Sequence, residues 1–286
     1  MIEFIGEAPL LIFGGPYSNL RATQALMAEA VRLAIPADRV ICTGDIVAYC
    51  AEPEETAAAI ARWGCRVIQG NCEQQLSAGA PDCACNFEEG SACDLLAKGW
   101  YPFAASRISA ESREWMGSLP STLRFRFGGQ SFRVVHGGVA VVSRWVFASD
   151  KRTIAEECAL AGAEADADVV IAGHCGVPFI ARSGCQVWFN AGVIGMPAND
   201  GTTDVWYGLV RQIGGRVSLS THRLTYDHHG AAAAMRRLGY ANGYARTLVT
   251  GLWPSLDVLP AAERAQTGKR LRPVSLQSSP AATSAA

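Results

Sequence analysis

Four polar side chains, each next to a glycine and each directly after an apolar run, are the strongest candidates for chemistry. They occur as Gly44-Asp45, Gly70-Asn71, His136-Gly137 and Gly173-His174. Short apolar runs that end this way predict buried strands, whose following side chains emerge at the edge of a sheet. One carboxylate, one amide oxygen and two imidazoles meeting there form a ligand set for a divalent cation such as Mn, Fe or Zn. Each residue alone also fits a helix cap, a turn or a core histidine; the combination of all four indicates a metal site.

Cysteine is the second unusual feature, with 10 in a chain of 286 residues. Four of them sit in strand or helix patterns and are expected to be small core residues: Cys42, Cys65, Cys158 and Cys185. The other six lie beside the polar strand ends or in the loop that follows Asn71. The N-terminal apolar run lacks the basic residues of an export signal, so we expect a cytoplasmic, reducing location and free thiols.

The elements that must position these residues change in character along the chain. In the first half, apolar runs ending at Gly14, Asp45 and Asn71 alternate with amphipathic stretches at about 19–34 and 54–63. This βαβαβ rhythm predicts an α/β sheet with polar residues at its carboxyl edge. The second half contains hairpin signals, with turns at Gly128-Gly129, Ser183-Gly184 and Gly214-Gly215. We therefore expect two sheets that face each other, with helices outside.

Composition restricts the partners and the domain organisation. The chain is 49% hydrophobic and has a formal net charge of −1, so it lacks the basic surface of a nucleic-acid or membrane-binding protein. We expect one main domain over 1–225, a C-terminal helical extension over 226–262 and a disordered tail over 263–286. Trp253-Pro254 in the extension indicates either an apolar anchor or a contact in a homo-oligomer.

The order of the four motifs resembles the calcineurin-like metallophosphoesterases, and especially the small bacterial phosphodiesterase and diadenosine-tetraphosphatase-like branch. Three other segments share the resemblance: Ser18-Asn19-Leu20, Asn190-Ala191-Gly192-Val193, and the stretch TYDHHGAAAAMRRLGY. The resemblance implies a four-layer α/β/β/α sandwich of two mixed sheets flanked by helices. It also implies hydrolysis of a phosphoric ester between two metal ions, with Asp45, Asn71, His136 and His174 as the complete ligand set of one ion.

The other metal site of the family is degenerate here. Gly15 and Tyr17 stand where the opening motif has aspartate and histidine, and Gly176 stands where the second histidine of the Gly-His-Thr-His turn is found. Cys72 replaces the histidine that assists the leaving group. We therefore expect Cys72 and Tyr17 to take part in catalysis, and Asn19 and Arg144 to contact the substrate.

Three functions remain open from the sequence. The first is a phosphoric-ester hydrolase with a modified, single-metal site that acts on a small phosphorylated substrate or nucleotide. The second is an altered phosphoesterase whose cleft holds a thiolate-bound metal or an iron–sulfur centre for redox, sensing or binding; its ligands would be Cys50, Cys72, Cys83, Cys85, Cys93 and Cys175. The third is a metal-free scaffold that binds a nucleotide or a protein through the old cleft.

Overall fold

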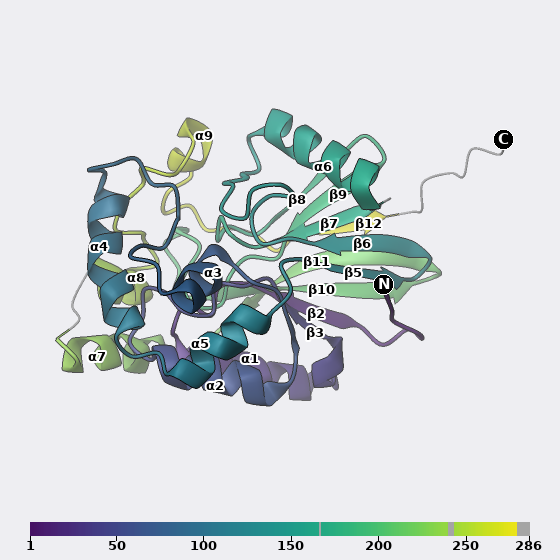
Figure 1. Ribbon diagram of the computed structural model, residues 1–286. Coiled ribbons are helices and arrows are strands. Elements are labelled where there is room, and N and C mark those ends of the chain that lie inside the picture. The colour runs from purple at the N-terminus through teal and green to yellow at the C-terminus, as the bar shows by residue number, and fades with distance from the viewer. Residues whose placement is uncertain (166, 240–242, 279–286) are drawn as a thin grey trace.

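Two six-stranded mixed sheets lie face to face in the computed structural model, and helices cover both outer surfaces (Figure 1). The structure describes residues 1–165, 167–239 and 243–278. This arrangement confirms the predicted four-layer α/β/β/α sandwich. The first sheet has the order β1 (Ile2–Glu3), β5 (Leu123–Phe127), β6 (Gln130–Val134), β7 (Val169–Ala172), β9 (Gln186–Asn190) and β8 (Phe179–Ser183). The second has the order β12 (Ser275–Ser278), β11 (Arg216–Leu224), β10 (Val205–Ile213), β2 (Leu10–Phe13), β3 (Val40–Cys42) and β4 (Arg66–Val67).

The apolar runs of the sequence become central strands, buried on both faces. All four residues of β2 are fully buried, because this strand has β3 and β10 as neighbours and apolar layers above and below. The inter-sheet core is rich in phenylalanine, and the rings of Phe125 and Phe132 stack with their centroids 4.6 Å apart. Burial of this apolar surface is the main force that holds the two sheets together.

The helices divide between the two outer faces. The sheet that contains β2 is covered by α1 (Leu20–Arg32), α2 (Pro53–Trp63), α3 (Asn71–Ala78), α4 (Ala92–Ala105), α5 (Ala110–Ser118), α7 (His228–Arg237) and α8 (Gly243–Thr250). The other sheet is covered by α6 (Lys151–Ala165), which packs on β8 and β9. The short α9 (Ala261–Arg264) follows in the C-terminal part. No helix among the described residues is long and apolar enough to cross a membrane.

Parallel strands bring the polar strand ends to one edge. In one sheet β2, β3 and β4 are parallel, and in the other β6, β7 and β9 are parallel. The carboxyl ends of the two sets meet, and a bridge between Gly14 and Val193 joins the sheets there. Residues that follow β3, β4, β6 and β7 therefore converge on one place, although they are far apart in the sequence.

The prediction of a disordered tail over 263–286 is wrong for its residues 275–278. Residues 275–278 form β12, which pairs with β11 from Val217↔Ser278 to Ser220↔Ser275. An edge strand is held mainly by main-chain hydrogen bonds and can therefore have polar side chains. Such a strand lacks the alternation of apolar and polar residues by which a sequence indicates a strand. The rest of the predicted tail, residues 279–286, lies outside the described residues. The predicted extension over 226–262 contains α7 and α8, and the Ala-rich segment forms α7.

Candidate metal centre

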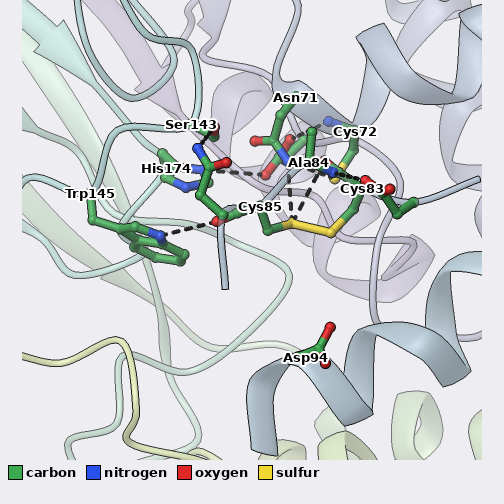
Figure 2. Close-up of a disulfide and its surroundings, with 12 residues drawn as sticks. Asn71, Cys72, Cys83, Ala84, Cys85, Asp94, Ser143, Trp145 and His174 are labelled. Carbon is green, nitrogen blue, oxygen red and sulfur yellow. Dashed lines mark hydrogen bonds and ion pairs between the residues drawn. A yellow bond between two sulfur atoms is a disulfide. The ribbon is translucent and has the colours of Figure 1, made fainter. Parts of the chain in front are cut away.

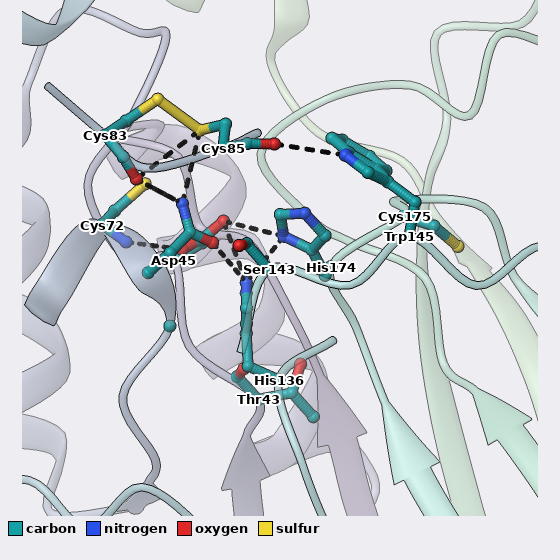
Figure 3. Close-up of polar contacts among 12 residues, drawn as sticks. Thr43, Asp45, Cys72, Cys83, Cys85, His136, Ser143, Trp145, His174 and Cys175 are labelled. Atoms are coloured by element: carbon teal, nitrogen blue, oxygen red, sulfur yellow. Dashed lines mark hydrogen bonds and ion pairs between the residues drawn. A yellow bond between two sulfur atoms is a disulfide. The ribbon is translucent and has the colours of Figure 1, made fainter. Parts of the chain in front are cut away.

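Donor atoms from the four polar strand ends converge, with those of Asp45, Asn71 and His174 lying around the Nε2 atom of His136; Figure 3 shows Asp45, His136 and His174 turned toward one another. His136 Nε2 lies 2.9 Å from His174 Nδ1, 3.1 Å from Asn71 Oδ1 and 3.2 Å from Asp45 Oδ2. Asp45 Oδ2 and His174 Nδ1 are 3.9 Å apart. In a tetrahedral site with metal–ligand bonds of about 2.0 Å, ligand atoms are roughly 3.3 Å apart. The donor set, buried within the protein, thus fits a single divalent ion in both spacing and chemistry.

The glycines that precede two of these ligands allow the close approach of the loops. A Cβ atom on Gly70 would overlap Asp45 Oδ1 and lie 2.9 Å from Cε1 of His136. A Cβ atom on Gly44 would overlap the backbone nitrogen of Gly70, and Gly44 has a left-handed φ of +94°. Any larger residue at either position would push the ligand loops apart.

Glu73 is a functional residue that the sequence interpretation missed. Its buried carboxylate accepts hydrogen bonds from the backbone N–H groups of Asp45 at 2.7 Å, Ile46 at 2.8 Å and Gly70 at 2.8 Å. These bonds hold Asp45 in the left-handed conformation, with φ +56°, that such a residue rarely adopts. Burial, together with the nearby Asp45 charge, raises the pKa of Glu73 to about 7. The sequence could have indicated Glu73 through its position as the last residue of the motif Gly70-Asn71-Cys72-Glu73.

Each imidazole turns one ring nitrogen toward the cluster, His136 its Nε2 and His174 its Nδ1. His136 Nδ1–H donates to the carbonyl oxygen of Thr43 at 2.7 Å, and this leaves Nε2 as an acceptor that faces inward. Burial by itself would lower the pKa of His136, but the Asp45 carboxylate raises it above its usual value. Burial lowers the pKa of His174, which keeps that ring neutral and able to bind a metal.

The loop after α3 orients the fourth ligand, Asn71 (Figure 2). Asn71 Nδ2 donates to the carbonyl oxygen of Cys83 at 2.8 Å and lies 3.3 Å from Cys85 Sγ. Because both contacts use the amide nitrogen, the amide oxygen turns toward His136. The Trp145 indole N–H donates to the Cys85 carbonyl at 3.2 Å, so the same loop also positions this ring.

Comparison with known proteins identifies the family. The sequence matches the calcineurin-like phosphoesterase superfamily domain over residues 18–210, which is more than half of the chain. The chain belongs to this family. No curated protein matches it.

Two solved structures share the fold of this phosphoesterase-family chain. A metallophosphoesterase from Sphaerobacter thermophilus is 22% identical with a TM-score of 0.67, over 86% of this chain and 100% of that one. A hypothetical protein from Pyrococcus horikoshii OT3 is 16% identical with a TM-score of 0.71, over 85% of this chain and 98% of that one. At these identities the likeness establishes the common fold.

The half-site that departs from the phosphoesterase motifs is filled by an aromatic ring. A Cβ atom on Gly15 would overlap Cζ of Tyr17 and lie 2.7 Å from both Cε atoms of that ring. Tyr17 is 5% exposed, so its ring occupies the space into which a side chain at position 15 would extend. A Cβ atom on Gly176 would face Trp253 at 3.5 Å. Neither glycine offers a side-chain donor atom, and among the described residues a single Asp/His/His group is found that could hold a metal ion.

The contacts of the six cysteines near the cleft do not support the predicted thiolate centre. Cys83 and Cys85 form a disulfide, contrary to the expectation of free thiols; the turn between them brings together two sulfurs only two residues apart. Cys50 contacts the carbonyl of Gly195, and Cys175 contacts Asn190 and Val177. Burial raises the pKa of Cys50, Cys72, Cys93 and Cys175, which favours neutral thiols. The metal-ligand group found among the described residues contains Asp45, His136 and His174 and no cysteine.

Asn19 and Arg144, predicted to bind substrate, have protein partners. Asn19 Nδ2 donates to the Gly195 carbonyl and the Tyr226 hydroxyl, and its Oδ1 accepts from the backbone at the start of α1. Arg144 pairs with Glu156 at 3.0 Å and Glu157 at 3.2 Å. These contacts show that Asn19 caps α1 and that the partly exposed Arg144 is paired with two glutamates; substrate contact by either residue stays a prediction.

Proposed function

We propose that this chain is a phosphoric-ester hydrolase that works with one divalent metal ion, Mn, Fe or Zn, held by Asp45, Asn71, His136 and His174. The observation that carries the proposal is the convergence of their donor atoms within 3.2 Å of His136 Nε2. An ion held there would supply Lewis-acid stabilisation of the charge that develops on a phosphoryl group. Its substrate is a small phosphorylated molecule.

The surrounding residues prepare the site for that ion. Thr43 and Glu73 fix the positions of His136 and Asp45 through main-chain hydrogen bonds. Such partners of the ligands orient the donor atoms and limit the reorganisation that metal binding requires. The site is therefore organised before the ion enters it.

Cys72 and Tyr17 are the proton-bearing side chains that we assign to the substrate side of the cluster. Burial, reinforced by the charge of Asp45, raises the pKa of both groups well above their usual values. Each therefore keeps its proton at neutral pH. A protonated thiol or phenol can donate a hydrogen bond to a phosphoryl or leaving oxygen, although each is a weaker acid than imidazolium.

The alternative of a thiolate-rich metal or iron–sulfur centre has less support. Two of its six sulfurs are bonded to each other, and Cys50 and Cys175 contact backbone carbonyls. A metal-free scaffold leaves the four converging donor atoms without a partner ion. The single-metal hydrolase accounts for more of the described contacts than either alternative.

Metal content and hydrolysis together test the proposal. The anaerobically purified chain should bind about one equivalent of Mn, Fe or Zn, as expected for one four-ligand site, and should cleave bis(p-nitrophenyl) phosphate. His174→Ala should lose both properties. His222→Ala, a change of a half-buried histidine on β11, is the matched control and should keep both. Hydrolysis that survives His174→Ala, or a brown protein with acid-labile sulfide, would refute the proposal.

A further inference from the structure

A pocket adjoins the ligand cluster on the side where the second metal site of the family is missing. Tyr17, His174 and Gly176 all line it. Its cavity volume is about 60 Å³. Since one water needs roughly 10–15 Å³, the pocket has room for a few waters or for part of a flat ring.

The wall of the pocket is aromatic and uncharged. Six of its lining residues carry aromatic rings other than imidazole: Tyr17, Tyr49, Phe87, Trp145, Tyr244 and Trp253. None of the lining residues is Asp, Glu, Lys or Arg. A charged group placed here would lose its hydration without gaining a counter-ion, whereas a flat apolar ring would gain stacking contacts and apolar burial.

Two of these rings are held in place by their indole N–H groups. Trp145 Nε1–H donates to Cys85 O at 3.2 Å, and Trp253 Nε1–H donates to Pro197 O at 2.7 Å. Both donors are satisfied by the protein, so a ligand meets the apolar faces of the rings. A wall that is already ordered lowers the entropic cost of binding.

The His174 ring contributes one unpaired polar atom next to this wall. Its Nδ1 faces the cluster, and its Nε2 is buried with no hydrogen-bond partner. Figure 3 shows the ring between the ligand cluster and Trp145, and its centroid is 4.2 Å from that of the indole. With Nδ1 as a metal ligand, Nε2 carries the proton, and no acceptor for it is found among the described residues.

We propose that this pocket binds a planar aromatic group of the substrate, attached to the phosphorus atom that lies at the metal centre. This proposal rests on the proposed function. The substrate class is thus an aryl or heteroaryl phosphoric ester, in which the ring enters the pocket and an acceptor atom beside it accepts a hydrogen bond from His174 Nε2–H. Tyr17 has a double role, because its ring fills the degenerate half-site and forms the pocket wall.

Equilibrium binding of two unreactive phosphonates separates the ring from the phosphoryl group. Phenylphosphonate and methylphosphonate are titrated by calorimetry into the chain loaded with Mn²⁺. Burial of about half of a phenyl ring should make phenylphosphonate bind about ten-fold more tightly than methylphosphonate. Equal affinity for the two compounds would overturn the pocket proposal and leave the metal centre untouched.

Two neighbouring leucines on α4 provide the variants. Leu96 lines the pocket, whereas Leu95 is 61% exposed. Leu96→Trp should fill the pocket and abolish the preference for phenylphosphonate while methylphosphonate binding stays unchanged. Leu95→Trp should keep the preference, and a loss of preference in both variants would contradict the assignment.

A third probe distinguishes failure of the pocket from failure of the metal centre. If neither phosphonate binds, the proposed metal-dependent function is wrong, and p-cresol then tests the pocket alone through tryptophan fluorescence. Binding of p-cresol that Leu96→Trp removes supports the aromatic pocket. Absence of p-cresol binding overturns it.

Discussion

The contact between Gly15 and the Tyr17 ring predicts that these two positions are energetically coupled. The perturbation is a double-mutant cycle of Gly15→Ala and Tyr17→Ala. Gly15 has a φ of +42°, and a Cβ atom there would overlap the ring of Tyr17. Alanine at position 15 should therefore be harmful for two separable reasons, backbone conformation and overlap with the ring.

The two terms can be estimated from the structure. A left-handed conformation costs a residue with a side chain about 1–2 kcal/mol. Displacement of the buried Tyr17 ring adds about 1–3 kcal/mol, as for other overpacked sites. Gly15→Ala alone should thus lower the free energy of unfolding by roughly 2–5 kcal/mol. Tyr17→Ala alone should lower it by about 3–5 kcal/mol, the usual loss for a buried ring.

In the double variant, alanine at position 15 should still pay the free-energy cost of its left-handed backbone, but no longer the cost of overlap with the Tyr17 ring. Its destabilisation should therefore be about 1–3 kcal/mol smaller than the sum of the single changes. Alanine is used at position 17 because Tyr17 also has a positive φ, of 51°; glycine there would relieve backbone strain and obscure the coupling.

Urea denaturation of the four proteins in the presence of a chelator measures the coupling without a contribution from bound metal. Gly15→Ala combined with Tyr101→Ala, a buried tyrosine on α4 that bonds to Ala80, serves as the control and should be additive within about 0.5 kcal/mol. Tyr17→Leu gives the same comparison if the alanine variant does not fold. Additive energies for positions 15 and 17, or a Gly15→Ala change without cost, would refute the argument.

Three further predictions concern other parts of the chain. Hydrogen bonding to Arg32 lowers the pKa of Glu29, so Glu29→Gln should cost less than about 1 kcal/mol near neutral pH, the usual limit for exposed pairs. In denaturant titrations this difference should vanish as the pH falls through the lowered pKa; a constant difference would contradict it. A Cys83→Ser/Cys85→Ser variant should loosen the loop that holds Asn71 and weaken metal binding by about two- to ten-fold, the worth of one hydrogen bond; an unchanged dissociation constant in a metal titration would disprove this role. Truncation before β12 should expose the edge of β11 and increase light scattering on heating, and identical scattering would argue against it.

The polar strand ends and the layers were predictable because both depend on short stretches of sequence. Apolar runs followed by Gly-Asp or Gly-Asn report a buried strand and its exit within a few residues. The family motifs add the order of these exits, and the family match confirms the resemblance. The structure then brings together Asp45, Asn71, His136 and His174, whose separation in the sequence hides their proximity.

What could not be predicted depends on contacts between distant or unexpected partners. Glu73 acts through backbone N–H groups of the Asp45 loop; its place in the motif that begins at Gly70 could mark it, but the sequence does not show which groups it contacts. The sequence gives Arg144 no charged neighbour, so it was predicted to contact the substrate. In the structure it pairs with Glu156 and Glu157 of α6. The pairing of Cys83 with Cys85 depends on the conformation of the loop between them, in which Ala84 has a positive φ of 49°.

The missing metal ligands and the aromatic pocket have one structural origin. Gly15 leaves the space that the Tyr17 ring occupies, and Gly176 leaves open the space in front of Trp253. A ligand side chain at either position would extend into the volume now filled or bordered by these rings. Under the proposed function, a second ion and the aromatic pocket would be alternative uses of the same region, and the chain would combine one group of candidate metal ligands with a surface suited to a flat, uncharged group. Restoring a single ligand cannot recover a two-metal centre, because the Tyr17 ring must leave the site before an aspartate at position 15 can enter it.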